Sequence, residues 1–410
     1  MKRLLLPLLL VVAFLVHAVD MTDFTRCVEI TVSYMPGEPL SDFPALVRLG
    51  TSISGFDYAD FKLTDGGDLR FLDADGNVLS HEIDTWNPGG MSLVWVRIPT
   101  LENDARIRCC YGCAQPVAAP SPDSVWTKYI AVIHGGGGIT NAVGNEVLAT
   151  AGSTNVTADA GAGKVGGGIH KSSYNSIGLN VTKPSDRLAD AGKFSVSGWF
   201  KRSGNGGSNG NGTFILGASR HGWDKGTGYL WLQEQGKYIS VAANSSHQWS
   251  SGSYTLPKDD WGHVAFSYES GVSLKSYFNG AADQTKSSPG NLASTAATWT
   301  FGSYQNTASN DSFAGDMDEL RIYDGVVGAA WIAAEYAAVA DGSFLSYGKV
   351  FSPSSATPSF QALARHPDTP TSRFPFRYWD SATVRRAEPL RSSWQRTKSL
   401  PLLLERDSST

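Results

Sequence analysis

Short stretches in which apolar and polar residues alternate recur along most of the chain, and turn residues separate them. Residues 27–34, 43–49, 68–72 and 92–98 show this pattern in the first quarter of the sequence. Alternation places one side of a strand in a core, whereas a helix needs a repeat near 3.6 residues. The 44 Gly among 410 residues and the charged share of only 18% are also typical of turn-rich β-proteins. We therefore predict an all-β fold and exclude a helical bundle.

The first eighteen residues have the parts of a secretory signal peptide. Lys2 and Arg3 form a basic start, residues 4–16 are an unbroken apolar run, and Ala18 ends a cleavage site. The run is shorter than the ~20 residues that span a bilayer, and no later stretch is apolar for that length. We expect removal of residues 1–18 and a mature protein without a transmembrane segment, exported to the periplasm, cell surface or extracellular space. An uncleaved membrane anchor is the alternative.

Four cysteines are present, at Cys27, Cys109, Cys110 and Cys113. An exported chain meets oxidising conditions, so disulfides are permitted. A bridge between the neighbours Cys109 and Cys110 is strained. The spacing of Cys110 and Cys113 is that of zinc and redox sites, but no second such pair and no suitable histidine pair follows. We predict a structural disulfide from Cys27 to Cys109 or Cys113, with the state of the other two cysteines open.

Residues 19–117 form the first predicted unit, in which about six short strands favour a compact β-sandwich. The stretches 56–61, 67–76, 81–90 and 92–97 resemble the domain-of-unknown-function 2341 family in their residues and in their order along the chain. The resemblance covers nearly the whole unit. It implies an extracytoplasmic bacterial module and brings no established chemistry. The cysteines of the last strand depart from the family pattern, so the cysteine chemistry is particular to this protein.

Residues 124–348 form a larger second unit. The stretches 194–199, 261–265, 277–280 and 317–323, with a short helix predicted at 328–336, resemble in order the laminin-G-like branch of the concanavalin-A-like jelly roll. The resemblance implies two stacked antiparallel sheets. It also implies carbohydrate or protein binding, often with one structural calcium.

Asp318 is the candidate calcium ligand. Related jelly-roll glycosidases carry a similar last strand whose Asp ligates a structural calcium, and Asp318 takes that position in this chain. Calcium needs six to eight oxygen ligands, so one Asp is a limited basis for a site. The alternative is a carboxylate bonded to the backbone and paired with Arg321. Strand alternation predicts Asp316 and Asp318 on one face and Glu319 on the other.

Two further patterns suggest catalysis, and neither is complete. Glu82 and Asp84 alternate on one strand, as the carboxylates of retaining jelly-roll glycosidases do, but the third carboxylate is missing. We expect them in a structural strand, facing the surface or a turn. His134 and the four glycines after it resemble the oxyanion loop of lipases, but no GxSxG motif accompanies them. A flexible connection is expected there, and the chain is predicted not to be an enzyme.

Trp223 and Trp249 are the candidate ligand-binding residues. Both stand in polar stretches that we interpret as loops. Loops on a rigid sandwich often carry binding residues, and an exposed indole stacks on a sugar face. The alternative is a tryptophan that packs on its own sheet.

Residues 349–410 differ from the rest of the chain. They contain no Gly, seven Pro, and ten Lys or Arg against five Asp or Glu. This composition favours a basic, disordered tail. A shifted-frame or truncated end of a longer surface protein is the alternative. The whole chain carries a net charge of -4, and without a basic excess we expect no nucleic-acid partner.

The sequence thus predicts an exported, non-catalytic protein of the bacterial envelope that binds a polysaccharide or another envelope glycan through the jelly roll. Other surface proteins are further expected partners. The second hypothesis is a structural, adhesive or sensing segment of a larger envelope protein, such as a periplasmic head linked to an ExbB/TolQ-like channel. A glycoside hydrolase is the third.

Overall fold

The structure is a computed structural model of the whole chain. It describes residues 20–114, 118–144, 147–159, 163–182, 192–203, 213–217, 230–235, 238–243, 248–251, 254, 256–289, 298–303 and 312–354. All of these belong to one compact unit. The predicted signal peptide and most of the predicted tail lie outside the described residues. None of the helices in the described part is both long and apolar enough to cross a membrane.

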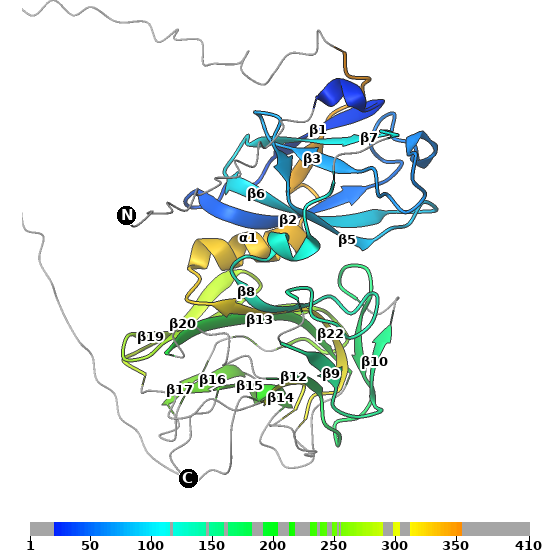
Figure 1. Cartoon of the computed structure of the whole chain (residues 1–410). Helices are drawn as coiled ribbons and strands as arrows, with labels where there is room; N and C mark the ends of the chain where they lie inside the picture. The colour runs from blue at the N-terminus through cyan, green and yellow to red at the C-terminus, as the bar shows by residue number, and fades with distance from the viewer. Residues whose placement is uncertain are drawn as a thin grey trace, which may run out of the picture. The chain divides into compact units, whose positions relative to one another are not determined.

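Two sheets form the first sandwich, in agreement with the all-β prediction (Figure 1). The first sheet, in the order β23-β1-β7-β3-β4, consists of β1 (Arg26–Val32), β3 (Arg70–Leu72), β4 (Val78–Leu79), β7 (Arg106–Tyr111) and β23 (Leu345–Tyr347). The second, in the order β2-β6-β5, consists of β2 (Leu40–Leu49), β5 (His81–Thr85) and β6 (Ser92–Leu101). Three short 3-10 helices accompany them, η1 (Met21–Asp23), η2 (Tyr58–Asp60) and η3 (Pro122–Val125).

Two larger sheets form the jelly roll, as predicted. The third sheet, β10-β11-β22-β13-β18-β19-β20 with β8 paired to β22, consists of β8 (Tyr129–Ile133), β10 (Val156–Asp159), β11 (Gly168–Lys171), β13 (Lys193–Arg202), β18 (Gly262–Glu269), β19 (Ser273–Phe278), β20 (Ala281–Ser287) and β22 (Gly315–Asp324). The fourth, β17-β16-β15-β14-β21-β12-β9, consists of β9 (Ala149–Ala151), β12 (Leu179–Thr182), β14 (Thr213–Gly217), β15 (Leu230–Gln235), β16 (Tyr238–Ala243), β17 (Gln248–Ser251) and β21 (Thr298–Phe301). One apolar core lies between these two sheets and contains side chains from both.

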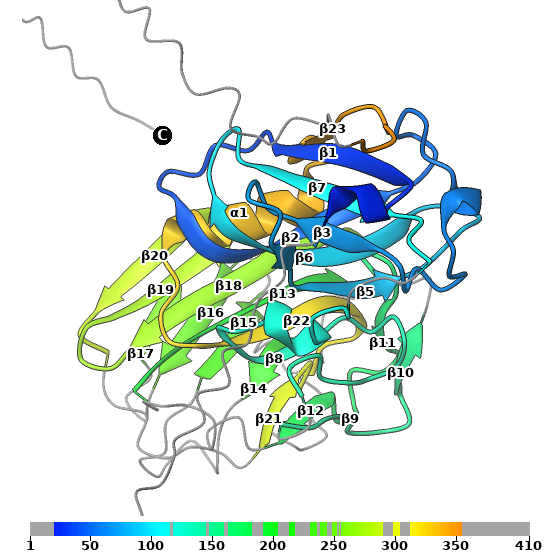
Figure 2. The ribbon, with the colours of Figure 1, turned by 45° about the horizontal axis from the view of Figure 1, so that its top comes forward.

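Helix α1 (Ala329–Ala340) lies between the two sandwiches (Figure 2). On one side its Trp331 ring contacts Phe43 of β2, with centroids 5.1 Å apart. On the other side Tyr336 stacks on Trp199 of β13 at 5.4 Å. Arg48 of β2 donates to the carbonyls of residues 338 and 339, which are among the helix-end acceptors that lack a partner within the helix. The first sandwich therefore both packs on α1 and caps it.

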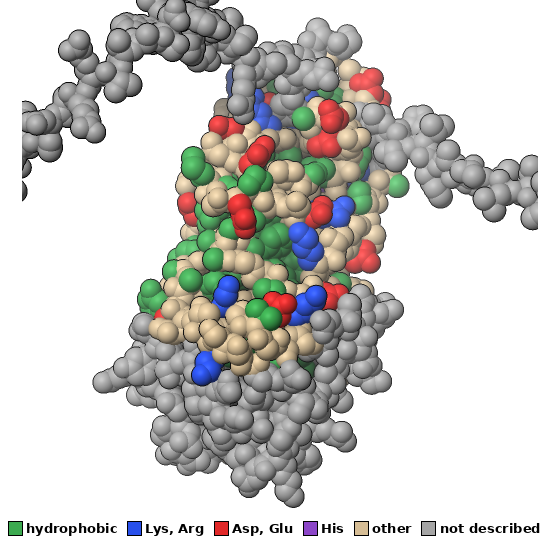
Figure 3. All heavy atoms as spheres, turned by 90° about the vertical axis from the view of Figure 1, so that its left-hand side faces the viewer, with side chains coloured by type: hydrophobic (Ala, Val, Ile, Leu, Met, Phe, Trp, Pro, Cys, Tyr) green, Lys and Arg blue, Asp and Glu red, His purple; other side chains and the backbone are tan. Residues whose placement is uncertain are grey.

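One side of the described surface mixes acidic and basic side chains without a single-sign patch (Figure 3). A nucleic-acid surface needs Lys and Arg gathered on one face. The side seen in Figure 3 shows no such gathering among the described residues.

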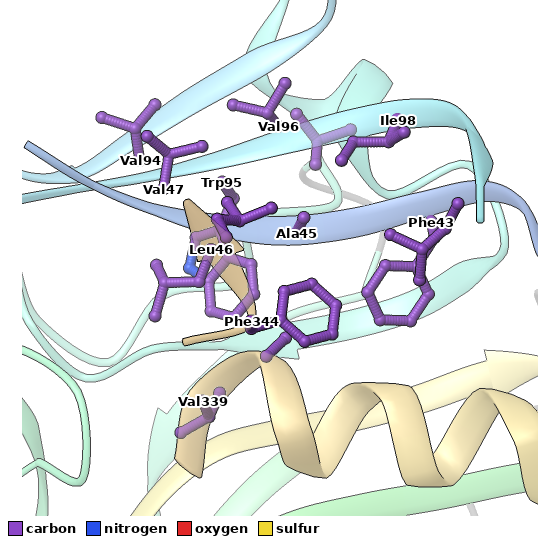
Figure 4. Close-up of a cluster of buried hydrophobic side chains, with 14 of the residues drawn as sticks. Phe43, Ala45, Leu46, Val47, Val94, Trp95, Val96, Ile98, Val339 and Phe344 are labelled. Carbon is purple, nitrogen blue, oxygen red and sulfur yellow. The ribbon is translucent and has the colours of Figure 1, made fainter. Parts of the chain in front are cut away.

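The second sheet is buried on both faces, because the first sheet covers one and α1 with the third sheet covers the other. Figure 4 shows apolar side chains on both sides of β2 and β6, with Val339 of α1 on one side. Eight of the ten residues of β6 are buried or half-buried, and the other two are exposed. The resulting core extends from Val28 of β1 to Trp199 of the jelly roll. The two sandwiches therefore share one hydrophobic core.

The chain returns to the first sandwich after α1. β23 pairs with β1, and Phe351 forms an isolated β-bridge with Cys27. The range predicted for the jelly roll thus contains a strand of the first sandwich. The tail was predicted to begin at residue 349, but Val350 is buried and donates to the carbonyl of Ser54. That start is too early, because this segment completes the first sheet.

The disulfide joins Cys27 to Cys110, so the predicted pairing of Cys27 with Cys109 or Cys113 is wrong. In the register of β1 against β7, Cys27 lies directly opposite Cys110. Adjacent residues of a strand point to opposite faces. Cys109 therefore enters the shared core, while Cys110 packs with Cys27 and Cys113 in a separate small cluster. Cys109 and Cys113 are free and buried.

Removing this disulfide should destabilise the first sandwich. It closes a loop with a sequence separation of 83, so the Cys27→Ala/Cys110→Ala double variant should lose about 2–4 kcal/mol in urea unfolding. Cys113→Ser serves as the control, because Cys113 belongs to the same cluster but forms no bridge. Non-reducing peptide mapping that found Cys27 joined to Cys109 or Cys113 would contradict the structure.

Candidate functional site

A bulge in β22 brings two acidic residues to one face of the third sheet. Asp318 lies opposite Trp199 of β13, but the register shifts before Arg321, so β22 has one extra residue there. Glu319 occupies the bulge with a φ of 50°, which is uncommon for a residue other than Gly. Leu320 enters the jelly-roll core, and Glu319 faces the first sandwich with Asp318 and Arg321. The predicted separation of Asp318 and Glu319 onto opposite faces is therefore wrong.

His134 reaches this face from β8. Ile133 lies opposite Leu320 in the β8–β22 register, and His134 is the next residue. Its Nδ1 lies 2.7 Å from Oε1 of Glu319, and its Nε2 lies 3.5 Å from Oε2 of Glu82. An imidazole of the jelly roll thus lies between carboxylates that come from both sandwiches.

Glu82 and Asp84 enter the same place from β5. The indole Nε1 of Trp126, which follows η3, donates a short hydrogen bond to Oε2 of Glu82. The Trp126 ring lies 5.4 Å from the rings of both Trp95 and His134. Asp84 Oδ2 is closed off from solvent and has no hydrogen-bond partner among the described residues. The prediction that these carboxylates face the surface or a turn is therefore wrong, because the jelly roll covers β5.

Arg321 is the buried cation of this region. Its Nη2 lies 2.7 Å from Oε2 of Glu319, and its Nη1 lies 3.6 Å from Oε1 of Glu335 on α1. The guanidinium carbon lies 4.6 Å from the Trp95 ring centroid and 5.2 Å from that of Trp126, close enough for cation–π attraction. Arg321 thus connects the third sheet, α1 and β6.

We refer to the six charged or polar residues that meet here as the interface cluster: Glu82, Asp84, His134, Glu319, Arg321 and Glu335.

Burial and neighbouring charge shift the pKa values in the cluster in different directions. Burial alone would lower the pKa of His134, but the charge of Glu319, the hydrogen bond with Glu319 and the nearby carboxylate of Glu82 raise it well above its ordinary value. Burial raises the pKa of Asp84 to about 6. For Glu319, burial acts upward, but the charges of His134 and Arg321 outweigh it and lower the pKa. The cluster can therefore hold protons or another cation against its carboxylates.

Of the four glycines in the connection predicted after His134, Gly135 and Gly136 are packed, whereas a Cβ on Gly137 or Gly138 would meet no atom within 4 Å. A Cβ on Gly135 would lie 2.6 Å from the backbone carbon of Gly168, and Gly135 has a φ of 79°. A Cβ on Gly136 would lie 3.2 Å from Oδ1 of Asp84. Only glycine lets this backbone approach both a neighbouring loop and a carboxylate so closely.

Asp318, the predicted calcium ligand, is fully buried beside the cluster. Its Oδ2 accepts from the backbone N of Val165 at 2.9 Å, and its Oδ1 accepts from the N of Glu319 at 2.8 Å. Burial, with the charge of Glu319, raises its pKa well above the ordinary value. Arg321 pairs with Glu319 and Glu335 instead of Asp318. Both oxygens of Asp318 accept hydrogen bonds from backbone N–H groups. Calcium binding by this chain stays a prediction.

Three side chains of the cluster offer atoms arranged as metal ligands. Single atoms of Asp84, His134 and Glu319 lie within 4.8 Å of one another. A nearby pocket of about 430 Å³ has Glu82 in its wall, together with Gly66, Gly67, Arg70, His81, Ile83 and residues 119–122. Glu82 therefore connects this pocket with His134.

Of the two tryptophans predicted to bind a ligand, the structure describes only the backbone of Trp249, in the fourth sheet. Trp249 lies in β17, opposite Ala242 of β16, and not in a loop as predicted. Trp223 stands in the stretch between β14 and β15 and lies outside the described residues.

Sequence reasoning missed Glu335, Trp95 and Trp126 as parts of a polar site. A sequence feature could have identified Glu335, because it is the only charged residue within the apolar helix α1. It is 3% exposed, accepts a short hydrogen bond from Ser197 and lies 3.4 Å from Nε2 of His263. A single charge in such a helix indicates a buried partner.

Two family models match the chain. Residues 65–133 match a domain of unknown function, DUF2341, and residues 175–333 match the concanavalin A-like lectin/glucanases superfamily. The chain therefore contains a DUF2341 module followed by a concanavalin-A-like domain, in the order that the resemblances predicted.

Several solved structures are similar to the chain. Domain 4 of AbnA, an extracellular GH43 arabinanase from Geobacillus stearothermophilus, solved with arabinotriose, has 21% identity and a TM-score of 0.38 over 50% of this chain and 97% of its own. The botulinum neurotoxin serotype D binding domain has 15% identity and a TM-score of 0.39 over 51% of this chain and 50% of its own. A pentraxin from Limulus polyphemus has 15% identity and a TM-score of 0.29 over 35% of this chain and 70% of its own. No curated protein matches the chain significantly.

Replacing Arg321 should destabilise the protein strongly. Arg321→Met leaves the buried carboxylates of Glu319 and Glu335 without their cation, and urea unfolding should show a loss of about 3–5 kcal/mol. Lys201→Met is the matched control, because Lys201 pairs with Asp316 at 2.8 Å but is 31% exposed. That change should cost about 1 kcal/mol or less. Equal losses for the two variants would contradict the role given to Arg321.

Proposed function

We propose that the chain is a non-catalytic carbohydrate-binding protein that acts outside the cytoplasm and binds a glycan through its jelly roll. The observation that carries this proposal is the match of residues 175–333 to the concanavalin A-like lectin/glucanases superfamily. The Cys27–Cys110 disulfide supports export, because such bonds persist in oxidising compartments.

The packing of the two sandwiches limits where a glycan can bind. The outer face of the third sheet meets α1 and the first sandwich, and Trp199, Ala265 and Tyr277 on that face belong to the shared core. The fourth sheet lies on the other side of the jelly roll (Figure 1). The fourth sheet and its loops, to which Trp249 and Trp223 belong by sequence, are therefore the place we assign to the ligand.

The burial of the interface cluster supports a binding function over hydrolysis. Glycoside hydrolysis needs two carboxyl groups on either side of a bound sugar. Glu319 is 1% exposed, and Glu82 and His134 are 16% and 11% exposed at their side chains. A sugar chain has no room between these groups.

The shared core favours a second candidate function, a structural or sensing segment of a larger envelope assembly. A sandwich pair that moves as one body can transmit force or position between partners, whereas loosely linked domains move independently by default. In this case the jelly roll would bind another surface protein in place of a glycan.

A glycan array separates these functions. The wild-type chain should bind at least one polysaccharide class, and Trp223→Ala or Trp249→Ala should weaken that binding at least about tenfold, since stacking on an indole supplies much of the affinity for a sugar. Trp261→Ala is the control, because Trp261 is half-buried next to the third sheet.

Wild-type binding with and without calcium tests the predicted calcium requirement in the same array. No binding to any glycan would contradict the proposal and favour the structural function. Release of reducing ends from a polysaccharide would contradict the non-catalytic part.

A further inference from the structure

The carboxylates of the interface cluster outnumber its cations. Glu82, Asp84, Glu319 and Glu335 lie close to one guanidinium, that of Arg321, and to two imidazoles, those of His134 and His263. Asp318 lies next to them in the chain and is fully buried. Buried anionic charge is costly unless protons, ion pairs or metal ions neutralise it. Arg321 neutralises the Glu319 side, and the Glu82–Asp84 side has no Lys or Arg among the described residues of the cluster.

Two polar atoms point to a ligand on that side. The Nε2 of His134 and the Oδ2 of Asp84 are both closed off from solvent, and neither has a hydrogen-bond partner among the described residues. Nε2 lies 3.5 Å from Oε2 of Glu82, which is too long for a good hydrogen bond. This distance between Nε2 and Oε2 is instead close to the ~3.4 Å that separates two ligand atoms of a tetrahedral cation with bonds near 2.1 Å.

The other ring nitrogen of His134 is already fixed. Nδ1 lies 2.7 Å from Oε1 of Glu319, and Oε2 of that carboxylate is bonded to Arg321. A histidine whose second nitrogen donates to a carboxylate is the usual arrangement of a metal ligand, because the carboxylate fixes the ring and its tautomer. Trp126 fixes Glu82 by donating its indole N–H to Oε2, the same oxygen that lies 3.5 Å from His134 Nε2.

We propose that Asp84 Oδ2 and His134 Nε2, the two unpartnered buried atoms, bind one divalent transition-metal cation, that Glu82, with its Oε2 3.5 Å from Nε2, completes the ligand set, and that Glu319 orients His134. The imidazole nitrogen selects a metal such as Zn²⁺ over Ca²⁺, which takes oxygen ligands, and the two carboxylates also suit Mn²⁺. Two carboxylates balance the charge of the cation, and the Glu319–Arg321 pair balances itself. This site joins β5 of the first sandwich to the end of β8 in the jelly roll, so the metal stabilises the contact between them.

One residue of the proposed site also lines a pocket. Glu82 stands in the wall of the pocket of about 430 Å³, on the side of the first sandwich. Gly136 and Gly166 lie next to the Asp84 carboxylate, and the absence of a side chain at both positions keeps space free beside it. A Cβ on Gly166 would lie 3.6 Å from Oδ2 of Asp84.

Metal content of the untagged full chain tests the proposal. Protein produced with added Zn²⁺ and purified without chelator should contain about one zinc per chain by plasma mass spectrometry. Protein refolded with EDTA should bind Zn²⁺ or Mn²⁺ in a titration and melt at a higher temperature with either ion than with Ca²⁺. Asp84→Asn should weaken zinc affinity at least about tenfold, because replacing even a residue that only supports a metal ligand lowers the affinity by about that factor.

Asp316→Asn is the matched control. Asp316 also bonds a histidine, His170, and lies on the same strand as Glu319, but outside the proposed site. It should keep one zinc with unchanged affinity. If Asp84→Asn fails to fold, Glu82→Gln provides the same test. A wild-type chain without zinc or manganese, or an unchanged affinity in the ligand variant that folds, overturns the proposal.

Discussion

The burial of the second sheet on both faces is the constraint on which the rest of the structure depends. A sheet covered on one face needs apolar residues only at alternate positions, whereas β2 and β6 are buried over most of both faces. The first sheet covers one face, and α1 with the third sheet covers the other. The two sandwiches are therefore parts of one body with a common core.

The interface cluster follows from this packing. Strands from the two sandwiches meet at β5, β8 and β22, where their polar side chains are largely shielded from solvent. Arg321 satisfies two carboxylates at once and lies over the rings of both Trp95 and Trp126. Pairing of this kind is needed wherever charge is buried, because an unpartnered charge costs several kcal/mol. The cluster therefore makes the contact between the sandwiches specific as well as tight.

The sequence predicted the strands, both modules and their order, because alternation and turn residues are local signals. It did not predict the disulfide partner, which depends on the register of β1 against β7, strands separated by more than 70 residues. It also noted Glu82, Asp84 and His134 one by one, but judged each against motifs within its own segment. Their partner Glu319 lies 185 residues after His134. Nothing in the sequence of β22 indicates the bulge at Glu319, because the extra residue shows only when the strand is paired with β13.

The central claim is that the two sandwiches unfold as one cooperative body. Hydrogen–deuterium exchange in increasing urea, read by mass spectrometry, tests it most directly with peptides from β6 and β22 as the two reporters. A shared core predicts that both peptides lose protection at the same urea concentration, because neither sandwich keeps its core without the other. Loss of protection in β6 at a clearly lower concentration, with β22 still protected, would show two independent domains and contradict the account.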